Sequence, residues 1–201
     1  MNVALRNNLS LPSVLAVHVV HRGYRRRPVF KEDGDAKYYL ELLTAELGRG
    51  RLSLLSYCIL SNHVHLVVTP AAPEVCGLVR KLHQAYGRYF HRKYGSRTLV
   101  WSGRWLQKPL DFIALWYVVR YVELNPVRAG VVVRAEDYPY SSARAHVLGR
   151  DERGVLDLKA WGRLFGDEKW GEELKRWERE QMRGQCVSRY LGRFYTFAEG
   201  A

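Results

Sequence analysis

The sequence predicts an α+β protein whose elements follow one another as strand, helix, strand, strand, helix, strand. Short β-branched runs bounded by Gly, Pro, Ser and Asn indicate the strands, and apolar residues at helical spacing indicate the two helices. With 201 residues and 47% apolar content, the chain is long enough for one packed domain with an appendage.

Residues 15–21 are apolar and β-branched and predict the first strand. Gly23 and Pro28 then indicate a turn. The arginines in this turn are Arg22, Arg25, Arg26 and Arg27. Such a loop suits a phosphate backbone, and it also suits a solvated run of charge.

The first helix is predicted over residues 33–47, where apolar residues recur at i, i+3, i+4 and i+7 and acidic residues stand at the start. Glycines 48 and 50 end it. Residues 52–60 predict the second strand, and Ser61-Asn62 is a short connection to a third strand that begins at His63. These two strands are expected to form a hairpin.

The third strand carries His63 and His65, which project to the same side because strand side chains alternate between faces. Imidazole is the commonest protein ligand for a divalent cation, so the pair fixes part of a coordination shell. Two ligands do not complete a site. A His-x-His triplet also fits two exposed or hydrogen-bonded strand histidines, so both interpretations stand at this point.

Residues 74–94 predict the second helix, whose apolar and aromatic stripe suits a core. Residues 100–108 indicate a short final strand preceded by a basic turn that contains Arg104 and is flanked by Trp101 and Trp105. Aromatic rings beside arginine suit unstacked bases as well as they suit the edge of a core.

Asp111 is a candidate cap for a helix from residue 112 to about Asn125, with Pro126 directly after it. Tyr117, Tyr121 and Asn125 share one face of this helix. A tyrosine and an amide one turn apart would supply a nucleophilic oxygen and a third oxygen ligand beside the histidine pair. Such a mixed nitrogen and oxygen set suits Mg or Mn. Alternatively, the tyrosines pack between helices and Asn125 caps the helix.

Beyond this helix the sequence predicts a turn-rich segment, helices over residues 159–165 and 168–183, and a basic, aromatic tail at residues 189–195. The tail after Gly184 is a further candidate for DNA contact.

The composition points to a partner rich in phosphate. The chain has 32 Lys and Arg against 20 Asp and Glu, a formal charge of +12. Three widely spaced cysteines favour a reducing compartment over a disulfide framework. No apolar run approaches the roughly 20 residues that a membrane span needs. We therefore expect a cytoplasmic, nucleoid-associated protein that binds nucleic acid and not a membrane.

Five segments together carry a family pattern. They are residues 19–23 (VVHRG), 62–68 (NHVHLVV), 100–105 (VWSGRW), 120–130 (RYVELNPVRAG) and 137–142 (DYPYSS). In this order they resemble the single-tyrosine transposases with a His-hydrophobic-His (HUH) motif, and within them the REP-associated tyrosine transposases of bacteria. The resemblance covers roughly residues 14–146 and implies a catalytic domain over that range, followed by a helical, basic extension over residues 147–201.

The resemblance implies a ferredoxin-like or RRM-like antiparallel sheet with helices on one face. It implies that Tyr121 is the nucleophile and that His63, His65 and Asn125 bind a divalent metal, Mg or Mn. Relatives often have Gln where Asn125 stands, which makes the coordination here looser or water-mediated, and Pro where Ser61 stands. The implied partner is single-stranded DNA with a REP-like hairpin, and relatives include both dimers and monomers.

The expected activity is that of a metal-dependent single-stranded DNA endonuclease and strand transferase with a 5′-phosphotyrosine intermediate. Arg22, Arg25, Arg26, Arg27 and Arg104 are the candidates for contacts to the DNA backbone. Two other interpretations remain. One is a non-catalytic, RRM-like module that binds nucleic acid. The other is a metal-dependent phosphodiesterase that uses activated water, for which Tyr121→Phe would still cut.

Overall fold

A four-stranded antiparallel sheet lies at the centre of the protein, and the computed structural model describes residues 14–70, 73–166 and 169–182. The strand order is β2-β3-β1-β4. The strands are β1 (Ala16–Arg22), β2 (Ser53–Leu60), β3 (His63–Thr69) and β4 (Leu106–Leu110). The helices are α1 (Asp33–Leu47), α2 (Glu74–Tyr94), α3 (Phe112–Arg128), α4 (Ala143–Leu148), α5 (Leu158–Phe165) and α6 (Trp170–Met182).

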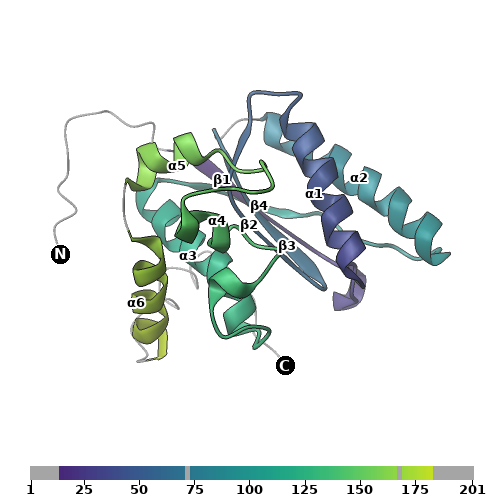
Figure 1. Ribbon diagram of the computed structural model, residues 1–201. Helices are drawn as coiled ribbons and strands as arrows, with labels where there is room; N and C mark the ends of the chain where they lie inside the picture. The colour runs from purple at the N-terminus through teal and green to yellow at the C-terminus, as the bar shows by residue number, and fades with distance from the viewer. Residues whose placement is uncertain (1–13, 71–72, 167–168, 183–201) are drawn as a thin grey trace.

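The predicted α+β class and antiparallel sheet are confirmed, with the elements in the predicted order. Helices α1 and α2 have the predicted bounds and lie together on one side of the sheet (Figure 1). The core between helices and sheet includes Val19, Leu43, Val64, Leu66 and Leu82. Burial of this helical stripe, rather than helix propensity, supplies most of the stability of such helices.

The two helices of the predicted ferredoxin-like unit, α1 and α2, lie on one face of the sheet, as the resemblance implied, and the other face is covered by α3 and the helices after it. Leu55, Cys58 and Val67 point away from α1 and α2 and pack in a second core with α3 and the helices after it. The physical reason lies in β2, which is buried along residues 54–60. Its apolar run does not alternate with polar residues, and such a run is typical of a strand covered on both faces.

Helix α3 extends beyond its predicted end at Asn125 and reaches Arg128, so Pro126 lies inside the helix. The proline stands in the last turn, where the absence of its N–H removes only one helical hydrogen bond. Backbone bonds from Ala129 to Asn125 and from Val131 to Pro126, both 2.9 Å, continue the turn past it. The predicted cap is present, because the Asp111 carboxylate accepts the Ala114 N–H at 2.7 Å.

The C-terminal helices pack against α3. Trp161, Phe165 and Trp170 share the second core with apolar residues of α3. The predicted helices over 159–165 and 168–183 correspond to α5 and α6. The predicted boundary at residue 146 falls within α4. The basic tail at residues 189–195 lies outside the described residues.

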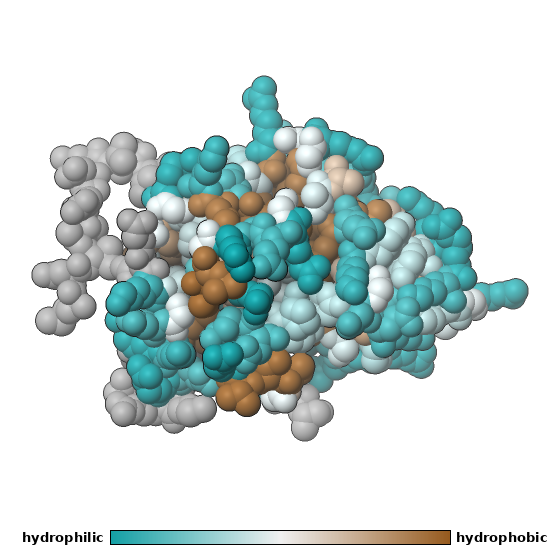
Figure 2. Space-filling model, in the orientation of Figure 1, coloured by the Kyte–Doolittle hydropathy of each residue, from teal (hydrophilic) through white to brown (hydrophobic). Residues whose placement is uncertain are grey.

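Hydrophilic side chains dominate the surface shown in Figure 2, and the apolar residues in that view form small, separate patches. Within the described residues, no helix is both long enough and apolar enough to cross a membrane.

Candidate functional site

His63 and His65 project from β3 toward α3. Their neighbours Val64 and Leu66 point to the opposite core, under α1 and α2. The two imidazole rings lie with their centroids 5.0 Å apart. Both histidines therefore lie on one side of the strand, as the sequence predicted.

His65 is held by a second histidine that the sequence reasoning did not single out. Its Nδ1 lies 2.9 Å from Nε2 of His18, on the neighbouring strand β1. Its Nε2 is buried and has no hydrogen-bond partner among the described residues. When the Nδ1–H of His65 donates to His18, the lone pair of His65 Nε2 is left for another group.

The histidines of this cluster favour the neutral form. Burial, together with the charge of Lys108, lowers the pKa of His18 to about 3. Burial also lowers the pKa of His65 well below its usual range, and the neighbouring histidines add to this effect. Burial and the charge of Arg22 lower the pKa of His63 to about 4. Neutral imidazole is the form that binds a metal.

His63 also has one ring nitrogen engaged. Its Nδ1 lies 2.6 Å from the side-chain oxygen of Asn62, the last residue of the β2–β3 turn. Since an amide oxygen only accepts, the Nδ1 of His63 carries the proton and its Nε2 has a lone pair. The Ser61-Asn62 turn therefore fixes the tautomer as well as the hairpin.

Tyr121 approaches the histidines from α3. Its ring packs edge-on against His65, with ring centroids 5.7 Å apart. The guanidinium of Arg128 lies 5.0 Å from the centre of the Tyr121 ring. Burial lowers the pKa of the Arg22 guanidinium, and the nearby Tyr121 opposes this shift. The tyrosine is thus placed between two arginines and the histidine pair.

Tyr117 occupies different surroundings, although it lies one turn before Tyr121. Its ring packs against Trp177 of α6, at a centroid distance of 5.2 Å. The contact with His65 is made by Tyr121. Packing therefore distinguishes two tyrosines that the sequence spacing left equivalent.

Asn125 lies one turn beyond Tyr121 on the same face of α3 and is 9% exposed. Its side-chain nitrogen donates to the backbone oxygen of Tyr121 at 2.8 Å. This bond commits the amide nitrogen to the helix, so the amide oxygen is the atom that remains for a ligand.

A divalent metal fits the chemistry of these donors. The observation that supports the fit is the buried, partnerless Nε2 of His65, whose other nitrogen is oriented by His18. No group of three His, Cys, Asp or Glu side chains is placed to hold a metal in the described part of the chain. On α3, the side-chain amide oxygen of Asn125 is an oxygen donor of the kind that hard divalent cations accept.

A buried polar network ties the tyrosine helix to the rest of the chain. Glu123 of α3 is fully buried and accepts hydrogen bonds from Ser142, at 2.5 Å, and from the ring nitrogen of Trp170, at 2.6 Å. Its carboxylate also lies 2.6 Å from Nδ1 of His146. A buried polar network of this kind favours one geometry. Because Ser142 also bonds to Ser56 and Tyr57 of β2, the network holds α3, and with it Tyr121, against β2.

The arginine loop, residues 22–28, follows the end of β1 beside this site, where the Asn62 side chain donates to the Arg26 oxygen at 3.3 Å. Arg25, Arg26 and Arg27 are exposed, and so is Arg104. A Cβ at Gly23 would lie 2.2 Å from the Arg27 oxygen, so the loop needs glycine there. Unlike these arginines, Arg22 is half-buried and opposite His63 in the strand register, which places it in the site itself.

The sequence reasoning missed His18 and Arg128 as parts of this site. His18 had a usable signal, because it stands an even number of residues before Arg22 on β1 and so faces the same side. Nothing in the local sequence pairs it with His65, since their contact depends on strand register.

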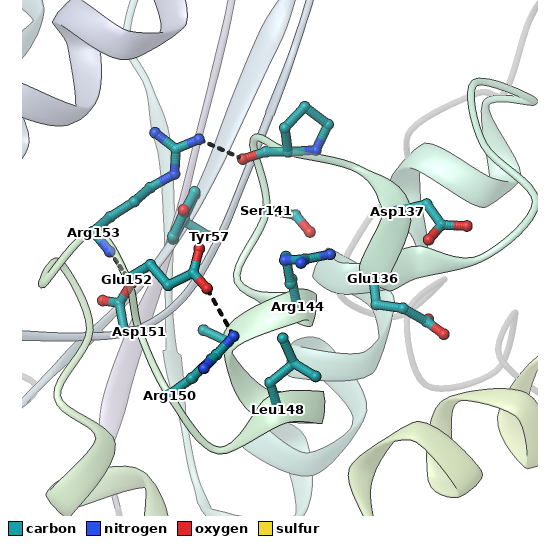
Figure 3. A pocket seen from close by; sticks show the side chains of 12 residues that line it. Tyr57, Glu136, Asp137, Ser141, Arg144, Leu148, Arg150, Asp151, Glu152 and Arg153 are labelled. Atoms are coloured by element: carbon teal, nitrogen blue, oxygen red, sulfur yellow. Dashed lines mark hydrogen bonds and ion pairs between the residues drawn. The ribbon is translucent and has the colours of Figure 1, made fainter.

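A separate cavity of about 280 Å³ lies between β2 and the loops around α4 (Figure 3). Its charged side chains have both signs and pair with one another, as Arg150 does with Glu152 at 3.1 Å. Arg153 donates to the Pro139 oxygen at 3.3 Å. The cavity shares no residue with the histidine and tyrosine cluster.

One solved structure with a TM-score above 0.5 supports this fold. It is a REP-associated tyrosine transposase bound to a REP hairpin, with a TM-score of 0.55 and 15% identity over 76% of this chain and 87% of that chain. A protein from Deinococcus radiodurans R1 described as a candidate transposase matches with a TM-score of 0.42 and 16% identity over 59% of this chain and 96% of its own. A search of curated proteins finds no match.

The family comparison covers the region that contains the site. The model described as "Transposase IS200 like" matches residues 12–125, more than half of the chain. This range includes the histidine pair, Tyr121 and Asn125. The chain therefore belongs to the IS200-like transposase family.

Proposed function

We propose that this protein is a metal-dependent endonuclease and strand transferase for single-stranded DNA, with Tyr121 as its nucleophile. The observation that carries the proposal is the contact between Tyr121 and His65, whose buried Nε2 has no partner among the described residues. It supports a site in which a phenol oxygen and a metal ligand meet at one phosphate.

The chemistry begins with the phenol, which is a weak nucleophile at neutral pH. A divalent metal, Mg or Mn, held by His63, His65 and Asn125 would polarise the scissile phosphate and offset its developing negative charge. Arg22 and Arg128 supply fixed positive charge beside the Tyr121 ring.

In the proposed step the Tyr121 oxygen forms a bond to phosphorus while the bond from phosphorus to the 3′ oxygen breaks. The phenol proton is lost to solvent, and the leaving oxygen takes up a proton to become a free 3′-OH. The product is a 5′-phosphotyrosine. Attack by another 3′-OH reverses the step and joins two strands, because the covalent link conserves the energy of the phosphodiester.

The proposed substrate is a hairpin with unpaired flanking nucleotides, as in a REP-like repeat. The solved relative is bound to a REP hairpin, and this chain has a basic loop beside the site. Arg25, Arg26, Arg27 and Arg104 are the proposed backbone contacts. If six phosphates are neutralised, the logarithm of the binding constant should fall with the logarithm of salt concentration at a slope of about −4 to −5.

A denaturing gel tests the proposal. Wild type, Tyr121→Phe and Tyr117→Phe are incubated with labelled hairpins that have random single-stranded flanks, in Mg, Mn or EDTA. We expect a covalent protein–DNA adduct that requires metal and is absent only in Tyr121→Phe. Cleavage that persists in Tyr121→Phe would instead support hydrolysis by activated water. Binding without any cleavage or adduct would support a non-catalytic module.

A further inference from the structure

A second basic feature lies on the other side of the sheet from the histidine site. It is a groove of about 550 Å³ between α2 and the segment of residues 97–105. Arg80, Arg88 and Arg97 line it and are exposed. Trp101 and Trp105 form part of its wall. None of the lining residues, all in the described part of the chain, is acidic.

This combination of side chains suits nucleotides. Guanidinium groups match phosphate oxygens, and indole rings stack on bases that are not stacked in a duplex. The positive charge of the groove would attract an acidic protein surface as well as a nucleic acid. The aromatic walls favour the nucleic acid, because indole rings stack on bases. We therefore take a nucleic-acid strand as its occupant.

Gly87 provides an independent observation. It lies in the interior of the 21-residue helix α2 and lines the groove. Glycine is the poorest helix former apart from proline. A Cβ at Gly87 would meet no atom within 4 Å, so the packing of the protein itself does not require glycine there. A glycine in such a position allows a ligand to approach the helix backbone closely.

The wall of the groove is preformed. Trp101 stacks on His21 with ring centroids 4.8 Å apart and the planes 15° from parallel. His21 is bonded to His83 at 2.7 Å, and His83 to the Tyr39 hydroxyl at 2.9 Å. These buried contacts fix the indole before any ligand binds, which lowers the entropy cost of binding.

The groove adjoins the proposed nuclease site at the end of β1. His21 lies under the groove, whereas Arg22 faces the site with Tyr121, because consecutive strand residues point to opposite faces. The backbone of Gly23 bridges to that of Trp101 between them. A DNA strand that leaves the scissile phosphate therefore needs to pass only the end of β1, where the arginine loop lies, to reach the groove.

We propose that the groove between α2 and residues 97–105 binds unpaired nucleotides that flank the hairpin, with bases against the tryptophans and phosphates on the arginines. This inference rests on the proposed function, since it assigns a second contact to the same DNA.

The test compares Gly87→Leu with Gly77→Leu. Gly77 lies on the same helix and lines a different cavity near the end of α1. A Cβ at Gly77 would also meet no atom within 4 Å. The ligands are one hairpin with single-stranded flanks and the same hairpin without flanks, at fixed salt. We expect Gly87→Leu to weaken binding of the flanked hairpin about tenfold. Gly77→Leu should leave it unchanged, and neither variant should affect the hairpin without flanks.

A double substitution of two arginines that line the groove gives a second test, in which no larger side chain is introduced. Arg88→Gln with Arg97→Gln should reduce the salt slope for the flanked hairpin by about 1.4, at roughly 0.7 per single-strand phosphate. Arg92→Gln, on the same helix but outside the groove lining, should leave the slope unchanged. Thermal unfolding of each variant checks that the fold is intact.

The outcomes separate this inference from the proposed function. Equal affinity of wild type and Gly87→Leu for the flanked hairpin, with an unchanged salt slope, would overturn the groove even if the Tyr121 adduct forms. An equal loss for both hairpins would overturn the specificity for unpaired nucleotides. A selective loss for the flanked hairpin supports the groove even where no adduct is found.

Discussion

The two faces of the sheet each contain a buried pair of hydrogen-bonded histidines. His18 and His65 lie on the α3 face, at 2.9 Å, and His21 and His83 lie under α1 and α2, at 2.7 Å. Both pairs begin from β1, and both are kept neutral by burial. The sequence alone does not show that these pairs differ.

The pairs differ in whether the second histidine, His83 or His65, has a ring nitrogen without a hydrogen-bond partner. Both ring nitrogens of His83 have partners, His21 and the Tyr39 hydroxyl. His65 uses one nitrogen for His18 and has no partner for the other, and it lies beside His63 and Tyr121. The His21–His83 pair also has one buried ring nitrogen without a hydrogen-bond partner among the described residues, Nε2 of His21. The two pairs therefore differ in their neighbours: His65 lies beside His63 and Tyr121, which can share a ligand with it, whereas His21 lies against Trp101 and Trp105.

The largest expected effect separates the two pairs directly. His65→Ala should reduce metal-dependent adduct formation on the order of 10³-fold or more, because it removes a proposed metal ligand. His83→Gln should retain at least about a third of wild-type adduct, since it changes the other pair. Single-turnover adduct formation measures both. Similar losses in the two variants would remove the distinction between the faces.

A smaller effect is expected from the residue that orients His65. His18→Phe should weaken metal affinity about 10- to 100-fold, the usual effect of removing a partner of a metal-bound histidine. Saturating metal should then restore much of the cleavage. Titration of adduct formation with Mn measures this, and His21→Phe is the matched change on the other face. A loss that excess metal does not rescue would point to a damaged fold.

On the opposite face we expect a change in stability without a change in chemistry. Tyr39→Phe removes the hydroxyl that pairs with His83 and leaves a buried ring nitrogen without that partner. This should lower the free energy of unfolding by about 1–3 kcal/mol. Urea denaturation measures the loss, and adduct formation per folded molecule at saturating DNA should stay as in wild type, because Tyr39 touches none of the proposed catalytic groups. A fall in that ratio would show that the two faces are coupled.

The smallest effect is a dependence of stability on pH. Burial lowers the pKa of His21 to about 4, against the opposing effect of the Gly103 and Ser102 backbone. In the unfolded chain the histidine binds this proton near pH 6.5. The contribution of neutral His21 to the free energy of unfolding is therefore complete above pH 6.5 and is lost as the pH falls toward 4. His83, which faces His21 from α2, has a pKa that burial lowers further, so it acts in the same direction.

Urea denaturation between pH 7 and pH 4.5 measures this slope. A variant with both His21→Phe and His83→Phe should have a flatter dependence over that range than wild type. An unchanged slope would show that other ionisable groups cause the loss of stability at low pH.

The sequence by itself determined the order of the elements, the bounds of α1 and α2, and the common direction of His63 and His65. These features depend on helical and strand periodicity and on turn residues, all of which act over a few positions. The ordered motifs also pointed to the family that the comparison over residues 12–125 supports.

Only the tertiary structure decided which groups meet those histidines. The register of β1 against β3 brings His18 to His65, and the packing of α3 selects Tyr121 rather than Tyr117. The same packing covers the second face of the sheet and buries Pro126 within α3. These contacts join residues distant in the chain, and local spacing carries no information about which distant surfaces will pack together.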